Sequence, residues 1–302
     1  MGLPERRARL LRRLLQLPVG VVLVAASVLK AADPADFAYQ ISSYEILPQG
    51  LGEATAIAFI IAEFAVGAAL LLDALPRFAL PGAAALLVGF TAVVAYAWSQ
   101  GRVQQCGCFG NSIQRTPGET IVEDLVLLAL TAGAFLLLRA GPPARPRPAL
   151  AFAALAGGIV LAVALPRLPV DDLFTALRPG AEVGLDPELL EDDLSQGDRL
   201  IAIWQVACDA CLRDLTQLER LATEPDGPRV VALFPDGNDA VMTFFLENGP
   251  SFDVASMPRG ALKPYYRKLP VYFLVRDGRV LTVWRDAAPD PATVRRALGR
   301  DS

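Results

Sequence analysis

Long apolar runs interrupted by few charged residues dominate the first 166 positions of the chain. They cover residues 14–31, 53–73, 78–98, 120–138 and 149–165. A helix that crosses ~30 Å of hydrocarbon at ~1.5 Å per residue needs about 20 such residues. The pattern therefore predicts an all-α transmembrane bundle, with four helices in residues 1–140 and a fifth transmembrane helix at 149–166.

The rest of the chain alternates short β-rich runs with helical stretches, which is typical of a soluble α/β domain. Residues 167–198 are rich in Pro, Asp and Glu and are interpreted as a linker and lead-in, and residues 199–302 form the domain itself. The predicted order is a strand at 199–205, a helix at 209–223, a strand at 229–235, helices near 238–248 and 260–268, two strands joined by Asp277-Gly278, and a closing helix at about 290–299. An Asp-Gly pair between apolar runs is a strong hairpin signal.

Composition narrows the functions that the chain can have. With 53% hydrophobic residues and a mean hydropathy of +0.39, the chain is too apolar for an ordinary soluble enzyme, and the lipid bilayer is a predicted partner. The net charge is -4 and no basic block follows the first thirteen residues, which excludes nucleic acid as a partner. The chain has no histidine, so its chemistry must rest on cysteines or carboxylates.

Basic residues in the short loops predict the orientation of the bundle. Nine lie on one side: Arg6, Arg7, Arg9, Arg12, Arg13, Arg77, Arg139, Arg145 and Arg147. Four lie on the other: Lys30, Arg102, Arg115 and Arg167. The amino terminus is therefore expected in the cytoplasm, and five crossings of the cell membrane place the loop 99–119 and residues 167–302 outside, where disulfides persist. A cleavable signal peptide in place of the first helix is the alternative, which Lys30 beside the candidate cleavage site disfavours.

Two of the four cysteines form a CxxC motif, Cys208-Asp209-Ala210-Cys211, between a predicted strand and a predicted helix. A sulfur at a helix N-terminus meets free N–H groups and the positive end of the helix dipole, which favours its thiolate. We expect Cys208 to be the nucleophile and Cys211 the resolving partner. A structural disulfide or half of a zinc site are the alternatives, and no resident metal is predicted.

The other two cysteines form the tighter motif Cys106-Gly107-Cys108 in the loop after the third run. Extended residues two apart have Cα atoms roughly 6 to 7 Å apart, at the upper edge of disulfide geometry. Closing this ring needs an unusual backbone, which Gly107 can supply. A strained disulfide is easier to reduce, so this pair, if it closes, is expected to be the stronger oxidant.

Charged residues inside the apolar runs are further candidates, because burying them in a membrane is costly. Glu63 is either a functional residue or the partner of a structural hydrogen bond to a neighbouring helix. Asp124, with Glu123, is interpreted as an interfacial cap close to the CGC loop or as a proton carrier. Lys30 with Asp33 is interpreted as a side chain that reaches toward the interface and a helix terminus.

The C-terminal region resembles thioredoxin-fold domains of membrane-anchored thiol-disulfide oxidoreductases. The resemblance rests on IWQVACDAC and KLPVYFLVRDGRVL. It implies that Trp204 precedes the CxxC motif and that Pro270 is a cis proline beside it, where backbone groups pair with a substrate chain. Asp209-Ala210 and Ala202 depart from the family pattern, which puts the redox potential and the proton donor in doubt.

The membrane region, from about Val19 to Leu138, resembles the family of the methylamine-utilisation membrane protein MauE, distantly related to DoxX-type bundles. The resemblance rests on LKAADPADFAYQISSYEILP, FIIAEFAVGAALLL with Glu63, CGCFG, and EDLVLLAL with Asp124. It implies a role in disulfide formation or electron supply for periplasmic proteins, including maturation of methylamine dehydrogenase.

Together these features predict a membrane thiol-disulfide oxidoreductase. Electrons would pass from extracytoplasmic protein thiols to Cys208–Cys211, then to Cys106–Cys108 and a membrane acceptor. By analogy with other four-helix membrane proteins that serve a thioredoxin-like partner, that acceptor is a quinone, and no other cofactor is predicted. The alternatives are a periplasmic disulfide reductase fed by a separate membrane donor, and a metal-handling or assembly factor that binds metal through thiolates.

Overall fold

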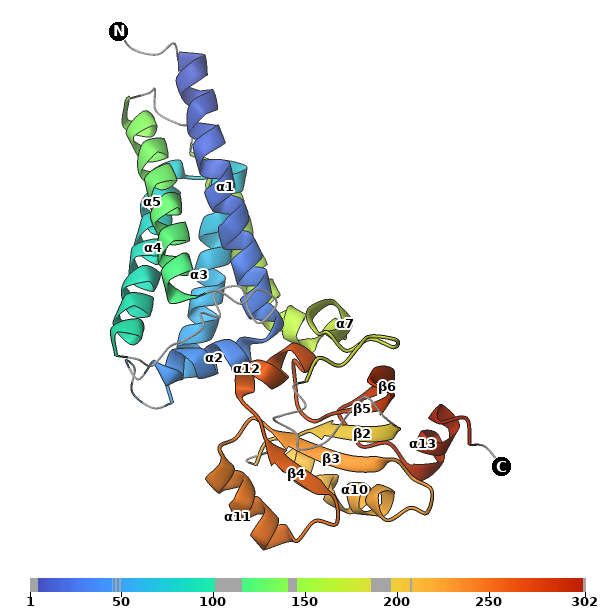
Figure 1. Cartoon of the computed structure of the whole chain (residues 1–302). Helices are drawn as coiled ribbons and strands as arrows, with labels where there is room; N and C mark the ends of the chain where they lie inside the picture. Colours follow the sequence, from blue (N-terminus) through green and yellow to red (C-terminus); the bar gives the residue numbers. More distant parts are fainter. Residues whose placement is uncertain are drawn as a thin grey trace. The chain divides into compact units, whose positions relative to one another are not determined.

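A computed structural model describes residues 5–44, 46, 48, 50–100, 116–140, 146–185, 197–206 and 208–300. The chain divides into two compact units, Met1–Leu168 and Pro169–Ser302. The first contains only helices among its described residues, and the second combines helices with a β-sheet (Figure 1).

The first unit is a bundle of long apolar helices. Its elements are α1 (Glu5–Ala32), α2 (Pro34–Ser43), α3 (Gly52–Leu72), α4 (Pro76–Ser99), α5 (Pro117–Ala140), α6 (Pro148–Ala164) and the short 3-10 helix η1 (Leu165–Arg167). Five of the described helices are long and apolar enough to cross a membrane, which confirms the five predicted crossings. The short helix α2 was not predicted. It begins where Pro34 follows Asp33, whose carboxylate accepts a hydrogen bond from the Asp36 N–H at 3.0 Å.

Close contact between helix backbones holds the bundle together. A Cβ atom added to Gly67 of α3 would lie 2.9 Å from the Cβ of Leu23 in α1, and one added to Gly158 of α6 would lie 2.9 Å from the carbonyl oxygen of Ile61 in α3. Only glycine permits these approaches, because any Cβ atom would collide with the neighbouring helix. Lipid tails supply no hydrophobic force between membrane helices, so close packing of this kind stabilises the bundle instead. Helix α1 is therefore packed into the bundle.

Two ion pairs, one partly buried and one buried, also join α1 to the α3 region. Near the start of α1, Arg12 pairs with Asp73 at 2.9 Å. In the last turn of α1, the Lys30 ammonium donates hydrogen bonds to both carboxylate oxygens of Glu63, each at 2.8 Å. The prediction that Lys30 reaches toward the interface was wrong, since a carboxylate on the neighbouring helix offers a partner and the residue is only 3% exposed.

The second unit is built on a five-stranded mixed sheet. Its elements are α7 (Asp171–Phe174), β2 (Asp198–Ile203), α9 (Asp209–Arg213), α10 (Leu215–Ala222), β3 (Arg229–Phe234), α11 (Asn238–Asn248), β4 (Asp253–Ser256), α12 (Arg259–Leu262), the 3-10 helix η2 (Lys263–Tyr265), β5 (Val271–Arg276), β6 (Arg279–Arg285) and α13 (Pro291–Ala297). The strand order is β4-β3-β2-β5-β6. Strands β2, β3 and β4 run parallel, whereas β5 runs antiparallel to both β2 and β6.

This order confirms the predicted alternation of strands and helices, with local differences. The predicted helix near 260–268 consists of the short helix α12 and the 3-10 helix η2, and α7 lies in the predicted linker. The predicted helix 209–223 breaks at Asp214 into α9 and α10, and the edge strand β4 was not predicted. Strand β4 is short and has the sequence DVAS, so it carries no apolar alternation that a pattern could detect.

Alternating residues of the strands supply a core on each face of the sheet. From β2, Leu200 and Ala202 belong to the core that α10, α11 and α13 cover. Ile201 and Ile203 belong to the opposite core, which also contains Leu177. The described part of the predicted linker, 169–185, is therefore packed into the second unit.

An ion pair fixes this lead-in. The Arg267 guanidinium donates to both carboxylate oxygens of Asp171, at 2.9 and 3.0 Å. Burial raises the pKa of Asp171, but the hydrogen bonds and charge of Arg267 outweigh that effect and hold this pKa below its usual value. The ionised form of Asp171 thus stabilises the folded unit.

We expect Asp171→Asn to lower the free energy of unfolding at pH 7 by about 2 kcal/mol, because Arg267 loses its charged partner. A depressed folded-state pKa contributes stability above the unfolded pKa of about 3.9 and loses it as the pH falls through the folded pKa. The difference from wild type should therefore shrink when urea unfolding, followed by tryptophan fluorescence, is repeated near pH 3. Asp172→Asn is the matched control, because that side chain is 73% exposed in its pair with Arg285. Equal loss in both variants would contradict the assignment.

Candidate active site

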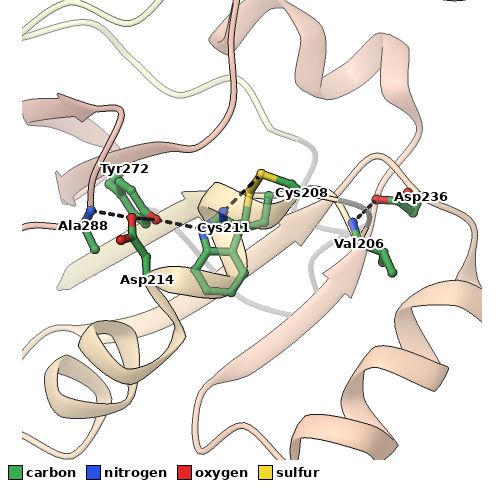
Figure 2. Close-up of a disulfide and its surroundings, with 8 residues drawn as sticks. Val206, Cys208, Cys211, Asp214, Asp236, Tyr272 and Ala288 are labelled. Atoms are coloured by element: carbon green, nitrogen blue, oxygen red, sulfur yellow. Dashed lines mark hydrogen bonds between the residues drawn. A yellow bond between two sulfur atoms is a disulfide. The ribbon is translucent and has the colours of Figure 1, made fainter.

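The CxxC cysteines form a disulfide at the carboxyl end of β2. Cys208 and Cys211 have Cα atoms 5.2 Å apart. Cys208 caps the start of α9, where its Sγ accepts a hydrogen bond from the Cys211 N–H at 3.1 Å (Figure 2). Cys208 is partly exposed and Cys211 is 1% exposed. Of the two sulfurs, that of Cys208 is the one an incoming thiolate can reach.

The register of the sheet places Pro270 at the same end. Strand β5 begins at Val271, which pairs with Ile203, the last residue of β2. The Leu269–Pro270 peptide bond, immediately before β5, is cis. Antiparallel pairing thus gathers Trp204, the disulfide and Pro270 at one end of the sheet. Their catalytic and supporting roles stay predictions.

A hydrogen-bonded chain lies behind the disulfide. The Trp204 Nε1–H donates to the Tyr272 hydroxyl at 3.0 Å, and that hydroxyl donates to Asp214 Oδ2 at 2.6 Å. The Ala288 N–H donates to the same Asp214 oxygen at 2.8 Å, and Figure 2 shows this carboxylate between Tyr272 and Ala288. Trp204 and Tyr272 are fully buried, so this chain satisfies polar groups that water cannot reach.

Tyr272 and Asp214 were not predicted as site residues. Burial raises the pKa of Tyr272, and the hydrogen bond to the Asp214 carboxylate raises it further, so the phenol stays protonated. Tyr272 looked like a core residue of the strand VYFLV, and Asp214 like a surface residue of one continuous helix. In the sequence, the only signal for Asp214 was its position three residues after Cys211. The structure shows that the helix breaks at this residue.

A second aspartate, Asp236, binds the backbone of the segment that leads from β2 to Cys208. The Val206 N–H donates to Asp236 Oδ2 at 3.0 Å, just after β3 (Figure 2). This bond fixes the backbone between β2 and Cys208.

The predicted membrane residues meet in a cavity of the first unit. Glu63 and Asp124 both line it, together with Lys30. Asp124 is 8% exposed and accepts a hydrogen bond from the Thr91 hydroxyl at 2.8 Å. Asp124 therefore does not cap a helix end, whereas its role as a proton carrier and the interfacial role of Glu123 stay predictions.

The residues that cap the start of α5 are Thr116 and Glu119. The Thr116 N–H donates to Glu119 Oε2 at 2.9 Å, and the Glu119 N–H donates to the Thr116 hydroxyl at 3.3 Å. This reciprocal arrangement satisfies the free N–H groups at the start of the helix. Asp124, more than a turn further along, faces the cavity.

Cys106, Gly107 and Cys108 lie outside the described residues. Among the residues that the structure describes, no group of three or more Cys, Asp or Glu side chains is placed to hold a metal ion.

The sequence of the first unit matches the family model described as methylamine utilisation protein MauE over residues 8–139. It is also 31% identical over 132 residues to methylamine utilization protein MauE from Paracoccus denitrificans, an alignment that covers 43% of this chain and 71% of that protein. The chain belongs to the MauE family. The MauE match spans α1 to nearly the end of α5 and includes the CGC motif, whereas α6 and the second unit lie beyond it.

Two solved structures of other proteins align with part of the chain. A structure described as a DsbE-type thiol:disulfide interchange protein from Chlorobium tepidum aligns with 22% identity and a TM-score of 0.35, over 41% of this chain and 95% of that one. StoA from Bacillus subtilis aligns with 17% identity and a TM-score of 0.30, over 34% and 84% of the two chains. Scores this low do not decide a fold.

The topology of the second unit itself decides the fold. A parallel β2–β3 pair is followed by the antiparallel strands β5 and β6, the CxxC pair follows the central strand, and a cis proline precedes β5. This combination is thioredoxin-like. The predicted fold of the whole MauE-family chain, a membrane bundle followed by a thioredoxin-like domain, is confirmed.

We expect Tyr272→Phe to lower the free energy of unfolding of the second unit by about 1–3 kcal/mol, because the buried Trp204 Nε1–H loses its acceptor and Asp214 loses a donor. Urea unfolding followed by tryptophan fluorescence measures the change. Tyr96→Phe is the control for removal of a hydroxyl, since Tyr96 is 49% exposed on α4. A loss no larger than in that control would contradict the role of the Trp204–Tyr272–Asp214 chain.

Proposed function

We propose that this MauE-family chain is a membrane-bound thiol-disulfide oxidoreductase whose substrates are cysteines of other proteins. The observation that carries the proposal is the disulfide between partly exposed Cys208 and buried Cys211, at a helix start and at the same end of the sheet as Pro270. A structural disulfide needs neither an exposed sulfur nor a neighbouring proline that frees backbone groups for a substrate strand.

The geometry supports a two-step exchange. A substrate thiolate attacks Cys208 Sγ, forming a mixed disulfide and releasing Cys211 as a thiolate. A second substrate thiolate then attacks the substrate sulfur of that mixed disulfide and releases Cys208. The substrate is thereby oxidised by two electrons and the CxxC pair is reduced by two. The Cys211 N–H, which donates to Cys208 Sγ, stabilises the departing Cys208 thiolate.

We further propose that the amino terminus is cytoplasmic and that both cysteine pairs are extracytoplasmic. The excess of Arg and Lys in the predicted cytoplasmic loops supports this orientation. Lys30 lies in α1 and pairs with Glu63 of the bundle, which supports retention of the first helix in place of a cleaved signal peptide. The substrates would then be secreted or periplasmic proteins. The name of the relatives supports a substrate that acts in methylamine utilisation, and we propose methylamine dehydrogenase as that substrate.

In the proposed oxidative direction, the reduced CxxC pair passes its two electrons to a Cys106–Cys108 disulfide by the same exchange. Support comes from the excess of Arg and Lys in the predicted cytoplasmic loops, which assigns both pairs to one compartment, and from the position of CGCFG within the residues that match the MauE model. A reductase would need a separate donor on the outer side, because all four cysteines lie outside in the proposed orientation.

Cys211→Ala should accumulate mixed disulfides with client proteins. The Cys208 thiolate attacks a client disulfide and releases one client thiolate, and the Cys211 thiol that would attack Cys208 Sγ to release the client is missing. Cys208→Ala should accumulate far fewer, since the remaining sulfur is buried. Non-reducing gels of intact cells quenched with acid and alkylated measure the adducts, and Ala210→Ser in the same motif is the control. Absence of adducts from both cysteine variants would contradict thiol exchange.

The direction of electron flow is tested by the redox state of Cys208–Cys211 in respiring cells. An oxidase keeps this pair mostly oxidised, and replacing Cys106 and Cys108 together by Ala should turn it mostly reduced, because its electrons can no longer leave. Thiol alkylation followed by a mass-shift gel reads the state, with Ser112→Ala in the same loop as the control. A pair that is mostly reduced in the wild type would favour the reductase instead.

A further inference from the structure

The membrane bundle contains a cavity of about 390 Å³ between α1, α3, α4 and α5. This volume lies in the range of small-molecule binding sites. Most of its wall is apolar, with residues such as Val22, Leu86 and Val126. Its polar groups are few and include Lys30, Glu63 and Asp124. An apolar cavity with a few converging polar groups is the usual form of a site for a largely apolar ligand.

The Lys30 ammonium is held in place by aromatic rings as well as by Glu63. Its nitrogen lies 5.5 to 5.6 Å from the ring centroids of Phe37, Phe59 and Phe90, a cation–π arrangement. An ammonium group has three N–H donors, and among the residues that the structure describes Lys30 donates to the two oxygens of Glu63. The third donor is therefore available for an acceptor inside the cavity.

The charges on the wall select the type of ligand. Glu63, Glu123 and Asp124 contribute carboxylates against the single ammonium of Lys30. An anionic headgroup, such as a phosphate or a fatty acid, would be repelled by these carboxylates. A neutral ring with carbonyl oxygens would accept from Lys30, and Phe59 and Phe90 supply aromatic surface for it.

The polar groups also lie at a defined end of the bundle. Lys30 is in the last turn of α1, and Asp124 lies in the second turn of α5, which begins at Pro117. The loop that carries CGCFG connects Ser99 at the end of α4 to this start of α5. The polar end of the cavity and the two attachment points of that loop therefore belong to the same end of the bundle.

We propose that this cavity binds a lipid-soluble quinone, with a carbonyl oxygen accepting a hydrogen bond from Lys30. The proposal rests on the proposed function, which supplies the reductant. A cysteine dithiol gives up two electrons and two protons and becomes a disulfide, and the quinone accepts both and becomes a quinol. Glu63 and Asp124 are placed to carry those protons to the two oxygens.

The test is equilibrium binding of a short-tail ubiquinone to the full chain in lipid nanodiscs, with empty nanodiscs as the reference for partitioning into lipid. We expect a saturable component of about one quinone per chain in the wild type. Lys30→Met combined with Glu63→Gln removes the donor without leaving an unpaired buried charge, and should weaken binding about tenfold. Arg12→Met combined with Asp73→Asn is the control, because that pair also joins α1 to the end of α3 but does not line the cavity.

A second pair of variants tests the cavity without touching its charges. Val126→Trp should fill the cavity and also weaken binding about tenfold. Leu125→Trp should not, because Leu125 is as exposed as Val126, at 54% against 56%, but does not line the cavity. A thermal midpoint equal to that of the wild type identifies the variants whose fold is intact.

Three outcomes would overturn the proposal: no saturable component in the wild type, binding unchanged in both cavity variants, or equal loss in the controls. The Cys211→Ala adduct assay does not involve the cavity. If adducts form but quinone does not bind, only the site is wrong. If quinone binds but no adduct forms, the thiol exchange is wrong.

Discussion

A charged or polar group that is buried without a partner costs free energy, and this constraint shapes both units of the protein. In the bundle, Lys30 cannot stay in an apolar interior alone, so Glu63 and three phenylalanine rings surround its ammonium. In the thioredoxin-like unit, the buried indole N–H of Trp204 requires Tyr272, whose hydroxyl in turn donates to Asp214. Each network joins elements far apart in the sequence and so fixes the packing around it.

The hydrogen-bonded chain of the thioredoxin-like unit lies next to the CxxC disulfide. Trp204 is four residues before Cys208 and Asp214 three residues after Cys211, so the same hydrogen-bonded chain anchors both sides of the disulfide. Around Trp204, the rings of Phe234, Phe252 and Tyr272 stand nearly perpendicular, at 88°, 84° and 86° to the indole. Edge-to-face packing of this kind is directional, and it holds the end of β2 in a defined position next to the CxxC disulfide.

Periodicity and composition were sufficient for the architecture, because a membrane span and a buried strand leave strong local patterns. The five membrane-spanning helices, the succession of strands and helices around CxxC and the hairpin at Asp277-Gly278 could all be predicted. Partners brought together only by folding could not: nothing local in α1 indicates that Lys30 meets Glu63, 33 residues later. The same holds for Tyr272 and Asp214, 58 residues apart. Strand β4 and helix α2 were not predicted because both are short, and β4 also lacks an apolar alternation.

The MauE match ends at residue 139, so one polypeptide joins a family membrane module to a thioredoxin-like unit that carries its own cysteine pair. Covalent linkage fixes their ratio at one to one and makes any encounter between the modules intramolecular. Its frequency is then set by an effective concentration that depends on the connection and not on how much of either module the cell makes. A separate soluble carrier would have to find the membrane module by diffusion, and would slow down whenever it became scarce. In the fused chain, electron transfer between the two cysteine pairs would proceed at the same rate per molecule at any expression level.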